Sequence, residues 1–140
     1  YWGDMTRTFV KGKASPAVRK LHEDVLAAQE MAFSLLRDGA ECQKVHEAVA
    51  ACFKGRGNSN GETGGKKTGF LHGTGHGIGL QIHELPRLGR VESKLLEGSV
   101  VTVEPGLYYP GVGAVREEDV VVITRDGHRN LNRMPKELEV

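Results

Sequence analysis

Four side chains of the kinds that bind metal ions stand in unusual sequence surroundings. Asp4 opens a β-branched and aromatic run, and His76 lies inside the glycine-rich stretch 73–77. Glu104 and Glu118 each lie within an apolar run typical of a strand. An ionised carboxylate that is buried in such a run must be paired or must bind a metal. For either glutamate alone, a solvent-facing position is the better explanation, because counting alternate residues does not decide which face it takes.

Taken together, the three carboxylates and the imidazole form an oxygen-rich donor set with a single nitrogen. Such a set suits hard or borderline divalent ions such as manganese, cobalt, iron or zinc. In hydrolytic sites, bridging carboxylates hold two ions about 3.5–4 Å apart, and the ions lower the pKa of a water and direct it at a carbonyl. The set therefore indicates a hydrolytic metal site more strongly than any one of its members does.

Two further histidines lie close to His76 in the sequence. His72 and His83 fall within twelve residues of each other, with His76 between them. Each of the two, taken alone, is best explained as a hydrogen-bonded loop histidine. For His76 the flanking glycines favour a functional site, because they allow close approach of the backbone and leave the imidazole free to reach a ligand.

The bulk composition is that of an ordinary globular domain. The chain has 140 residues, 39% of them hydrophobic, and a formal charge of +1, which gives no electrostatic reason to expect nucleic acid or an anionic membrane as a partner. No apolar run is long enough to span a bilayer. Cys42 and Cys52 lie ten residues apart in one predicted helix, or about 15 Å. We therefore expect reduced thiols and a cytoplasmic protein.

The elements that would position these residues give an α+β class. A strand is predicted over 5–10. Ser15-Pro16 is typical of a helix start, and the apolar spacing continues to a stop at 38–39. A second helix is predicted over 43–54, followed by a mobile glycine-rich loop over 55–69. The remaining chain is expected to form strands over 78–83, 99–109 and 114–124, with a hairpin at 110–113 and a short polar tail.

Four blocks in order resemble the signatures of the pita-bread metallopeptidases, which include methionine aminopeptidases, Xaa-Pro aminopeptidases and prolidase. The blocks read GDMTRTF, HGTGHGIGLQIHE, VEPGLY and VREEDVVV, and they run from residue 3 to residue 122. Any one block is weakly specific, whereas four in order are highly specific. The resemblance implies the pita-bread fold, with residues 1–140 forming the C-terminal portion of a single catalytic domain.

The resemblance also implies a role for each metal-binding side chain. Asp4 is similar to a bridging aspartate, His76 and Glu104 resemble the terminal ligands of one ion, and Glu118 resembles the second bridge. Glu118 is preferred to its neighbour Glu117 because the family ligand stands two places after an arginine, here Arg116. Arg116 is then expected to hold a ligand carboxylate in place.

The remaining histidines bear on catalysis and specificity. His83 resembles the residue that contacts the scissile region and stabilises the tetrahedral intermediate, and His72 is the second expected catalytic side chain. Within the family, His72 four places before His76, and the Pro-Gly-Leu-Tyr that follows Glu104, favour the proline-specific branch. The expected function is removal of an N-terminal residue preceding proline. Two alternatives stay open, a methionine aminopeptidase and a catalytically inactive module that binds a peptide or protein.

One departure from the family pattern concerns the number of metal ions. The family has a further aspartate about ten residues before Asp4, and this chain begins too late to contain it. We therefore expect two divalent ions, manganese first, in a full-length relative, and one in this chain. The expected partner is a peptide with proline second, and the sequence leaves open whether the chain forms a homodimer.

Overall fold

Two helices follow each other in the first part of the chain. The computed structural model describes all 140 residues. Helix α1 (Pro16–Leu35) begins as predicted, because Ser15 caps it by accepting a hydrogen bond from Val18 N at 3.3 Å and proline occupies its first turn. Helix α2 (Cys42–Gly55) differs from its prediction by one residue at each end. Both cysteines are unpaired. Neither helix is long and apolar enough to cross a membrane.

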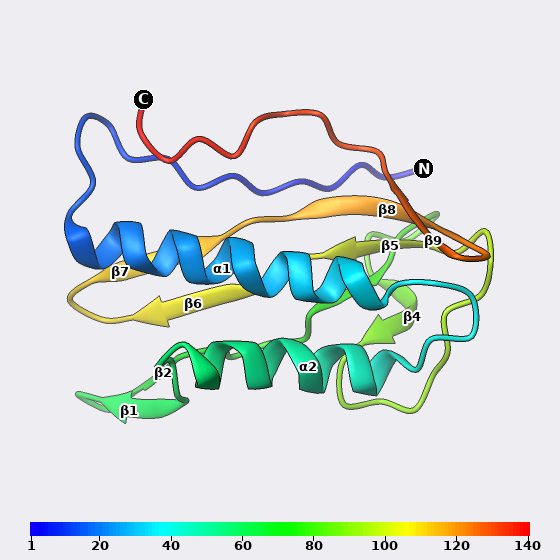
Figure 1. Cartoon of the computed structure of the whole chain (residues 1–140), viewed down its shortest axis with the longest axis horizontal. Coiled ribbons are helices and arrows are strands. Elements are labelled where there is room, and N and C mark those ends of the chain that lie inside the picture. The colour runs from blue at the N-terminus through cyan, green and yellow to red at the C-terminus, as the bar shows by residue number, and fades with distance from the viewer.

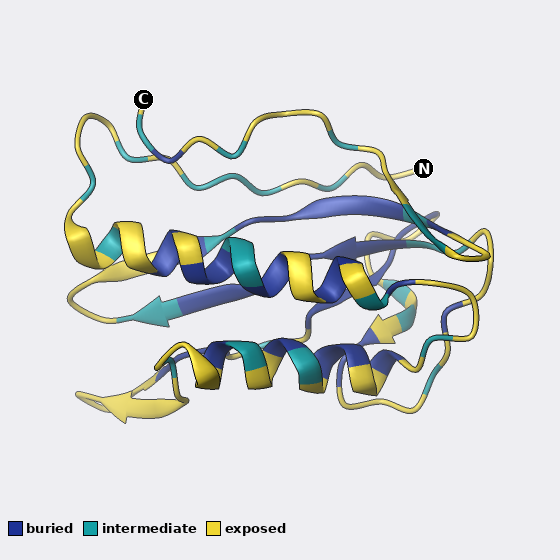
Figure 2. Cartoon of the chain, viewed as in Figure 1, coloured by how far each residue is buried: buried dark blue, intermediate teal, exposed yellow.

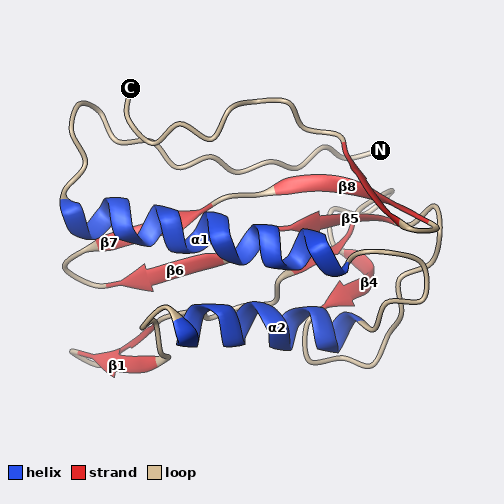
Figure 3. Ribbon diagram, in the orientation of Figure 1, coloured by secondary structure: helices blue, strands red, loops and turns tan.

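Nine short strands form three antiparallel sheets (Figures 1 and 3). A five-stranded sheet has the order β4-β3-β5-β8-β9, and β1-β2 and β6-β7 form two further two-stranded hairpins. The strands are β1 (Gly61–Thr63), β2 (Lys66–Thr68), β3 (Gly75–Gly77), β4 (Glu84–Leu88), β5 (Val100–Val103), β6 (Gly106–Tyr109), β7 (Gly113–Arg116), β8 (Asp119–Thr124) and β9 (Gly127–Asn130). The helices and the antiparallel pairing confirm the α+β class.

The two long predicted strands are each interrupted, and each interruption contains one of the candidate glutamates. Residues 99–109 divide into β5 and β6 around Glu104-Pro105, and residues 114–124 divide into β7 and β8 around Glu117-Glu118. The breaks are visible in Figure 3 as loop segments between arrows. Proline has no N–H to give to a ladder, which accounts for the first break. The second break falls in the charged run Arg116-Glu117-Glu118-Asp119.

Three other predicted elements were wrong. The strand over 5–10 is an extended segment with isolated bridges at Thr6 and Val10. The loop over 55–69 contains the hairpin β1-β2, whose Gly64-Gly65 turn has two positive φ angles. The strand over 78–83 is a loop between β3 and β4, and glycine-flanked His76 lies in a strand. Which of these segments pair as strands depends on distant parts of the chain, and the local composition does not record it.

The core lies between the helices and the large sheet. In Figure 2 both helices turn their buried faces toward the strands and their exposed faces outward. The buried cluster draws on both helices and on the central strands, and includes Val25, Ala32, Val49, Phe53, Leu88, Val101, Val103, Leu107 and Ile123. The terminal segments run side by side in Figure 1, and Val10 pairs with the expected polar tail. Leu138 of that tail is buried.

Candidate metal centre

The hairpin register places Glu104 and Glu118 opposite each other. Val103 pairs with Asp119 on one side of the breaks and Gly106 pairs with Arg116 on the other. The register is thus continuous across the gap, so Glu104 faces Glu118 on the neighbouring strand. Cross-strand neighbours in antiparallel sheets place their Cβ atoms about 4.5–5.5 Å apart on one face. Two residues fourteen positions apart are therefore brought together by the hairpin.

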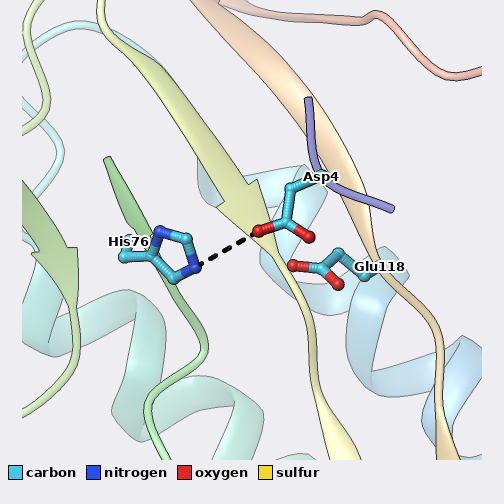
Figure 4. A group of neighbouring side chains, drawn as sticks. All are labelled: Asp4, His76 and Glu118. Atoms are coloured by element: carbon cyan, nitrogen blue, oxygen red, sulfur yellow. Dashed lines mark ion pairs between the residues drawn. The ribbon is translucent and has the colours of Figure 1, made fainter. Parts of the chain in front are cut away.

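The neighbouring segments add one candidate ligand each. Beside β5 runs β3, where His76 Nε2 lies 3.3 Å from Glu104 Oε1. The N-terminal segment runs beside the start of β8, where Thr6 forms an isolated β-bridge with Glu118. Asp4 lies two residues before Thr6 in that segment. Asp4 Oδ2 lies 3.8 Å from His76 Nε2. One ligand atom from each of Asp4, His76 and Glu118 lies within 4.8 Å of the others. Figure 4 shows these three side chains pointing toward one another.

Hydrogen bonds orient these side chains. His76 Nδ1 donates to the Gly77 carbonyl at 3.0 Å, which leaves Nε2 as the ring atom that faces the carboxylates. The Thr102 hydroxyl lies 3.4 Å from Glu104 Oε1 and accepts from the His76 backbone N–H at 3.0 Å. The Thr6 hydroxyl donates to Glu118 Oε2. Fixed orientation of this kind is what a metal-binding side chain needs.

The next glutamate along the chain faces elsewhere. Glu117 is fully buried and accepts a hydrogen bond from the Thr8 backbone N–H at 3.1 Å. Its Oε1 lies 3.4 Å from His22 Nε2, and its Oε2 lies 3.8 Å from Arg7 Nε. The structure therefore places Glu118, and not Glu117, beside Asp4 and His76.

The crowding of three carboxylates changes the proton affinities of the cluster. Burial raises the pKa of Glu118, and the negative charges of Glu104 and Asp4 raise it further. Burial, the largest single effect, would raise the pKa of Glu104 too, but the hydrogen bond with His76 and the nearby charges of His76, His72 and Arg116 together lower the pKa. For His76, burial lowers the pKa, and the contacts with Glu104 and Gly77 reverse the shift. The cluster therefore gains from a positive charge at its centre.

The donor set fits a divalent ion. One ligand atom from each of Asp4, His76 and Glu118 lies within 4.8 Å of the others, and Glu104 adjoins this group through its carboxylate oxygen, which lies 3.3 Å from His76 Nε2. The other ring nitrogen of His76 is hydrogen-bonded to a carbonyl. Oxygen-rich sets with one imidazole suit manganese, cobalt, iron or zinc. Asp4, His76, Glu104 and Glu118 are thus the residues that would hold the ion.

Arg116 reaches the cluster indirectly. The sequence predicts that it holds a ligand carboxylate, whereas its Nε donates to the Thr6 hydroxyl at 3.3 Å, and that hydroxyl in turn donates to Glu118. A second guanidinium nitrogen donates to the Tyr108 hydroxyl at 3.4 Å. The sequence analysis predicted no role for Thr6 or Tyr108, although both lie inside the signature blocks.

His72 and His83 lie on the wall of a cleft that the cluster adjoins. His72 Nδ1 donates to the Gly73 carbonyl, and its Nε2 lies 2.8 Å from the Tyr108 hydroxyl. His83 is exposed, and its ring centroid lies 4.2 Å from that of His76. The cleft has a volume of about 780 Å³, and its lining includes both histidines, His76 and Glu104. The site therefore has room beside the cluster for part of a peptide.

Carboxylates and a histidine gathered on neighbouring segments of one antiparallel sheet form the kind of donor set that hydrolytic metal sites use. The sequence model of metallopeptidase family M24 matches residues 1–125, and the chain belongs to this family. Its strands and helices are those of the pita-bread fold.

Individual relatives are similar along nearly all of the chain. The Xaa-Pro dipeptidase of Pyrococcus furiosus is 37% identical over 139 residues, which are 99% of this chain and 38% of the relative. An X-Pro aminopeptidase structure from Thermotoga maritima has a TM-score of 0.87 at 33% identity, over 99% of this chain and 38% of that one. A Xaa-Pro dipeptidase structure from Bacillus anthracis has the same TM-score at 35% identity, over 99% and 37%. The chain thus spans well under half the length of these relatives.

Proposed function

We propose that this chain carries the metal centre of a metallo-exopeptidase that removes the N-terminal residue preceding proline. The observation that supports this most directly is the convergence of Asp4, His76, Glu104 and Glu118 beside a cleft lined by two further histidines. The names of the relatives, Xaa-Pro dipeptidase and X-Pro aminopeptidase, supply the class of substrate.

Each protein group has a definable task in this chemistry. A divalent ion, with manganese proposed first, would supply Lewis-acid catalysis and a water of lowered pKa. The four candidate ligands would fix the position of that ion. His83, exposed in the cleft and next to His76, would donate a hydrogen bond to the substrate oxygen on which negative charge develops. His72, fixed at both ring nitrogens, shapes the cleft wall.

A dipeptidase is the second candidate, and the charge of the cleft favours it. Lys67, Arg87 and Arg90 line the same cleft as the candidate ligands. A dipeptide places its free carboxylate one residue beyond the scissile bond, and guanidinium groups bind carboxylates well. A longer peptide, the substrate of an aminopeptidase, has an uncharged amide at that position.

A peptide panel separates these functions. The protein to use is this chain extended upstream to the length of its relatives and loaded in turn with Mn²⁺, Co²⁺, Zn²⁺ or Fe²⁺. We expect release of the first residue from Xaa-Pro tripeptides. Selective cleavage of Xaa-Pro dipeptides, with loss of activity on their C-terminal amides, would replace the aminopeptidase by a dipeptidase.

The same panel tests the two other functions. Preference for Met-Ala over Xaa-Pro peptides would replace the proposal by a methionine aminopeptidase. Absence of turnover with metal bound, together with measurable peptide binding, would favour an inactive binding module. A cytoplasmic location stays a prediction, to be checked by cell fractionation, and sedimentation decides whether the chain forms a homodimer.

A further inference from the structure

Gln29 is a fully buried amide on the apolar face of α1, where its neighbours one turn away are Val25 and Ala32. A buried amide costs free energy unless it is hydrogen-bonded. Gln29 Nε2 donates to the Val103 carbonyl at 2.9 Å and to the Glu117 carbonyl at 3.2 Å. Its Oε1 accepts from Lys136 Nζ at 2.6 Å. Both amide protons and the oxygen are thus used.

The two carbonyls occupy equivalent places in the site. Val103 directly precedes Glu104, and Glu117 directly precedes Glu118. Both carbonyls lie at the breaks in the hairpin, where α1 crosses it (Figure 1). In the continuous register Pro105 lies opposite Glu117, and proline has no N–H to donate. Gln29 thus supplies a donor where the ladder lacks one.

Lys136 fixes which way the amide points. An ammonium group can only donate, so it selects the amide oxygen and turns the NH₂ group toward the strands. Lys136 is itself held by Asp119 Oδ2 at 2.7 Å. One short network therefore runs from the C-terminal segment through α1 to both broken strands.

We propose that Gln29 is a positioning residue for the metal centre, and that it sets the separation of Glu104 and Glu118 by holding the backbone of both strands from one side chain. This inference rests on the proposed metal centre. The amide touches neither the carboxylates nor a substrate; it acts through the two carbonyls. Because metal ions demand ligand placement to within about 0.5 Å, loss of this clamp should weaken metal binding even in a folded chain.

The test is Gln29→Met, which keeps the side chain's length and removes both donors. The readout is titration of the metal-free 140-residue chain with Co²⁺, followed by the visible absorption of the bound ion, which reports both affinity and coordination geometry. We expect the dissociation constant to rise about 10- to 100-fold, with a shifted absorption band. A circular dichroism melt shows that the variant is folded.

Ala32→Gly is the matched control, because it weakens α1 one turn away and leaves the Gln29 amide intact. We expect this control to lower the melting temperature and to bind Co²⁺ as the unmodified chain does. Equal Co²⁺ affinity and an equal spectrum in Gln29→Met would overturn the proposal. So would an equal loss of affinity in the Ala32→Gly control. Failure of the unmodified chain to bind Co²⁺ would instead remove the metal centre and the role of Gln29 with it.

If Gln29→Met does not fold, Lys136→Met decides the matter. This change removes the ammonium that orients the amide and lies on a partly exposed side chain. A Co²⁺ dissociation constant raised at least threefold supports the positioning role, and an unchanged constant overturns it.

Discussion

His76 and His83 stack edge to face with ring centroids 4.2 Å apart, yet their surroundings are opposite. His76 is buried, with one nitrogen bound to the Gly77 carbonyl and the other facing Glu104 and Asp4. His83 is exposed to the cleft. A fixed, buried imidazole suits metal binding, whereas an exposed one can reach a substrate. Replacing His76 and replacing His83 should therefore have different effects on metal binding and on catalysis.

Replacing His83 by Ala should lower kcat about 100-fold or more, because a donor to the developing oxyanion is lost, while the metal content stays near normal. Replacing His76 by Ala should lose metal and activity together, because a ligand is removed. Both changes belong in the upstream-extended protein, with kinetics and metal analysis made on the same samples. Unchanged turnover in the His83 variant would contradict its catalytic role.

Gly75 shows a different kind of constraint, because it leaves no room for a side chain. A Cβ there would lie 1.9 Å from the Thr102 carbonyl oxygen, in the strand that leads to Glu104. Gly75→Ala should lower the free energy of unfolding by about 3 kcal/mol and weaken metal binding, since β3 must move away from β5. At Gly89, the nearest atom to a new Cβ lies 3.9 Å away, so Gly89→Ala is the matched control. Chemical denaturation compares the two, and equal stability would refute the close packing.

At the scale of elements, an ion network fixes the two helices relative to each other. Asp24 of α1 is fully buried and accepts hydrogen bonds from Lys20, from Arg56 after α2, and from Asn58 at 2.7 Å. Burial would raise the pKa of Asp24, but these donors outweigh it and lower the pKa. The carboxylate therefore ties the end of α2 to the middle of α1.

This network predicts a specific acid dependence of stability. Because the folded pKa of Asp24 is lowered, its contribution is present above the ordinary aspartate pKa of about 3.9 and is lost as the pH falls through the folded value. Asp24→Asn should cost about 2 kcal/mol at pH 7 and flatten the decline of stability below pH 4. Glu30→Gln, at an exposed position of the same helix, is the control. Urea unfolding from pH 2 to 7 gives both curves, and parallel curves would contradict the prediction.

At the scale of the molecule, the metal centre depends on segments that are far apart in the sequence. Asp4, His76, Glu104 and Glu118 come from the N-terminal segment, β3 and the two hairpin breaks, and they meet only when the sheet is complete. The helices cover one face of that sheet and the termini lie along it (Figures 1 and 2). Unfolding of any one of these segments should therefore lower the metal affinity.

The number of bound ions follows from this arrangement. The chain brings together one cluster of candidate ligands, and the Thr6 hydroxyl occupies one oxygen of Glu118. We expect the 140-residue chain to retain one divalent ion after dialysis, and a chelator to remove it and lower the melting temperature. Mass spectrometry of the native chain and elemental analysis both measure this ratio. Two tightly held ions per chain would contradict the expectation.

The sequence by itself determined the helices and the candidate ligands. Ser15-Pro16 and the apolar spacing of α1 are local signals, because capping and helical periodicity involve residues within a few positions of each other. The resemblance to the family rested on four short blocks, whose residues and order can be read directly from the linear sequence. For the same reason Asp4, His76, Glu104 and Glu118 could be named without coordinates.

Only the tertiary structure decided how the strands divide and what holds the ligands. The breaks at Glu104 and Glu118 lie between apolar stretches that look like parts of one strand, and period-two alternation does not record where a ladder stops. Thr6, Gln29 and Tyr108 act through partners up to 112 residues away, as the Thr6–Glu118 contact shows. Hydrogen bonds of that range leave no periodic trace in the chain, because they depend on which segments pack together and not on which residues are neighbours.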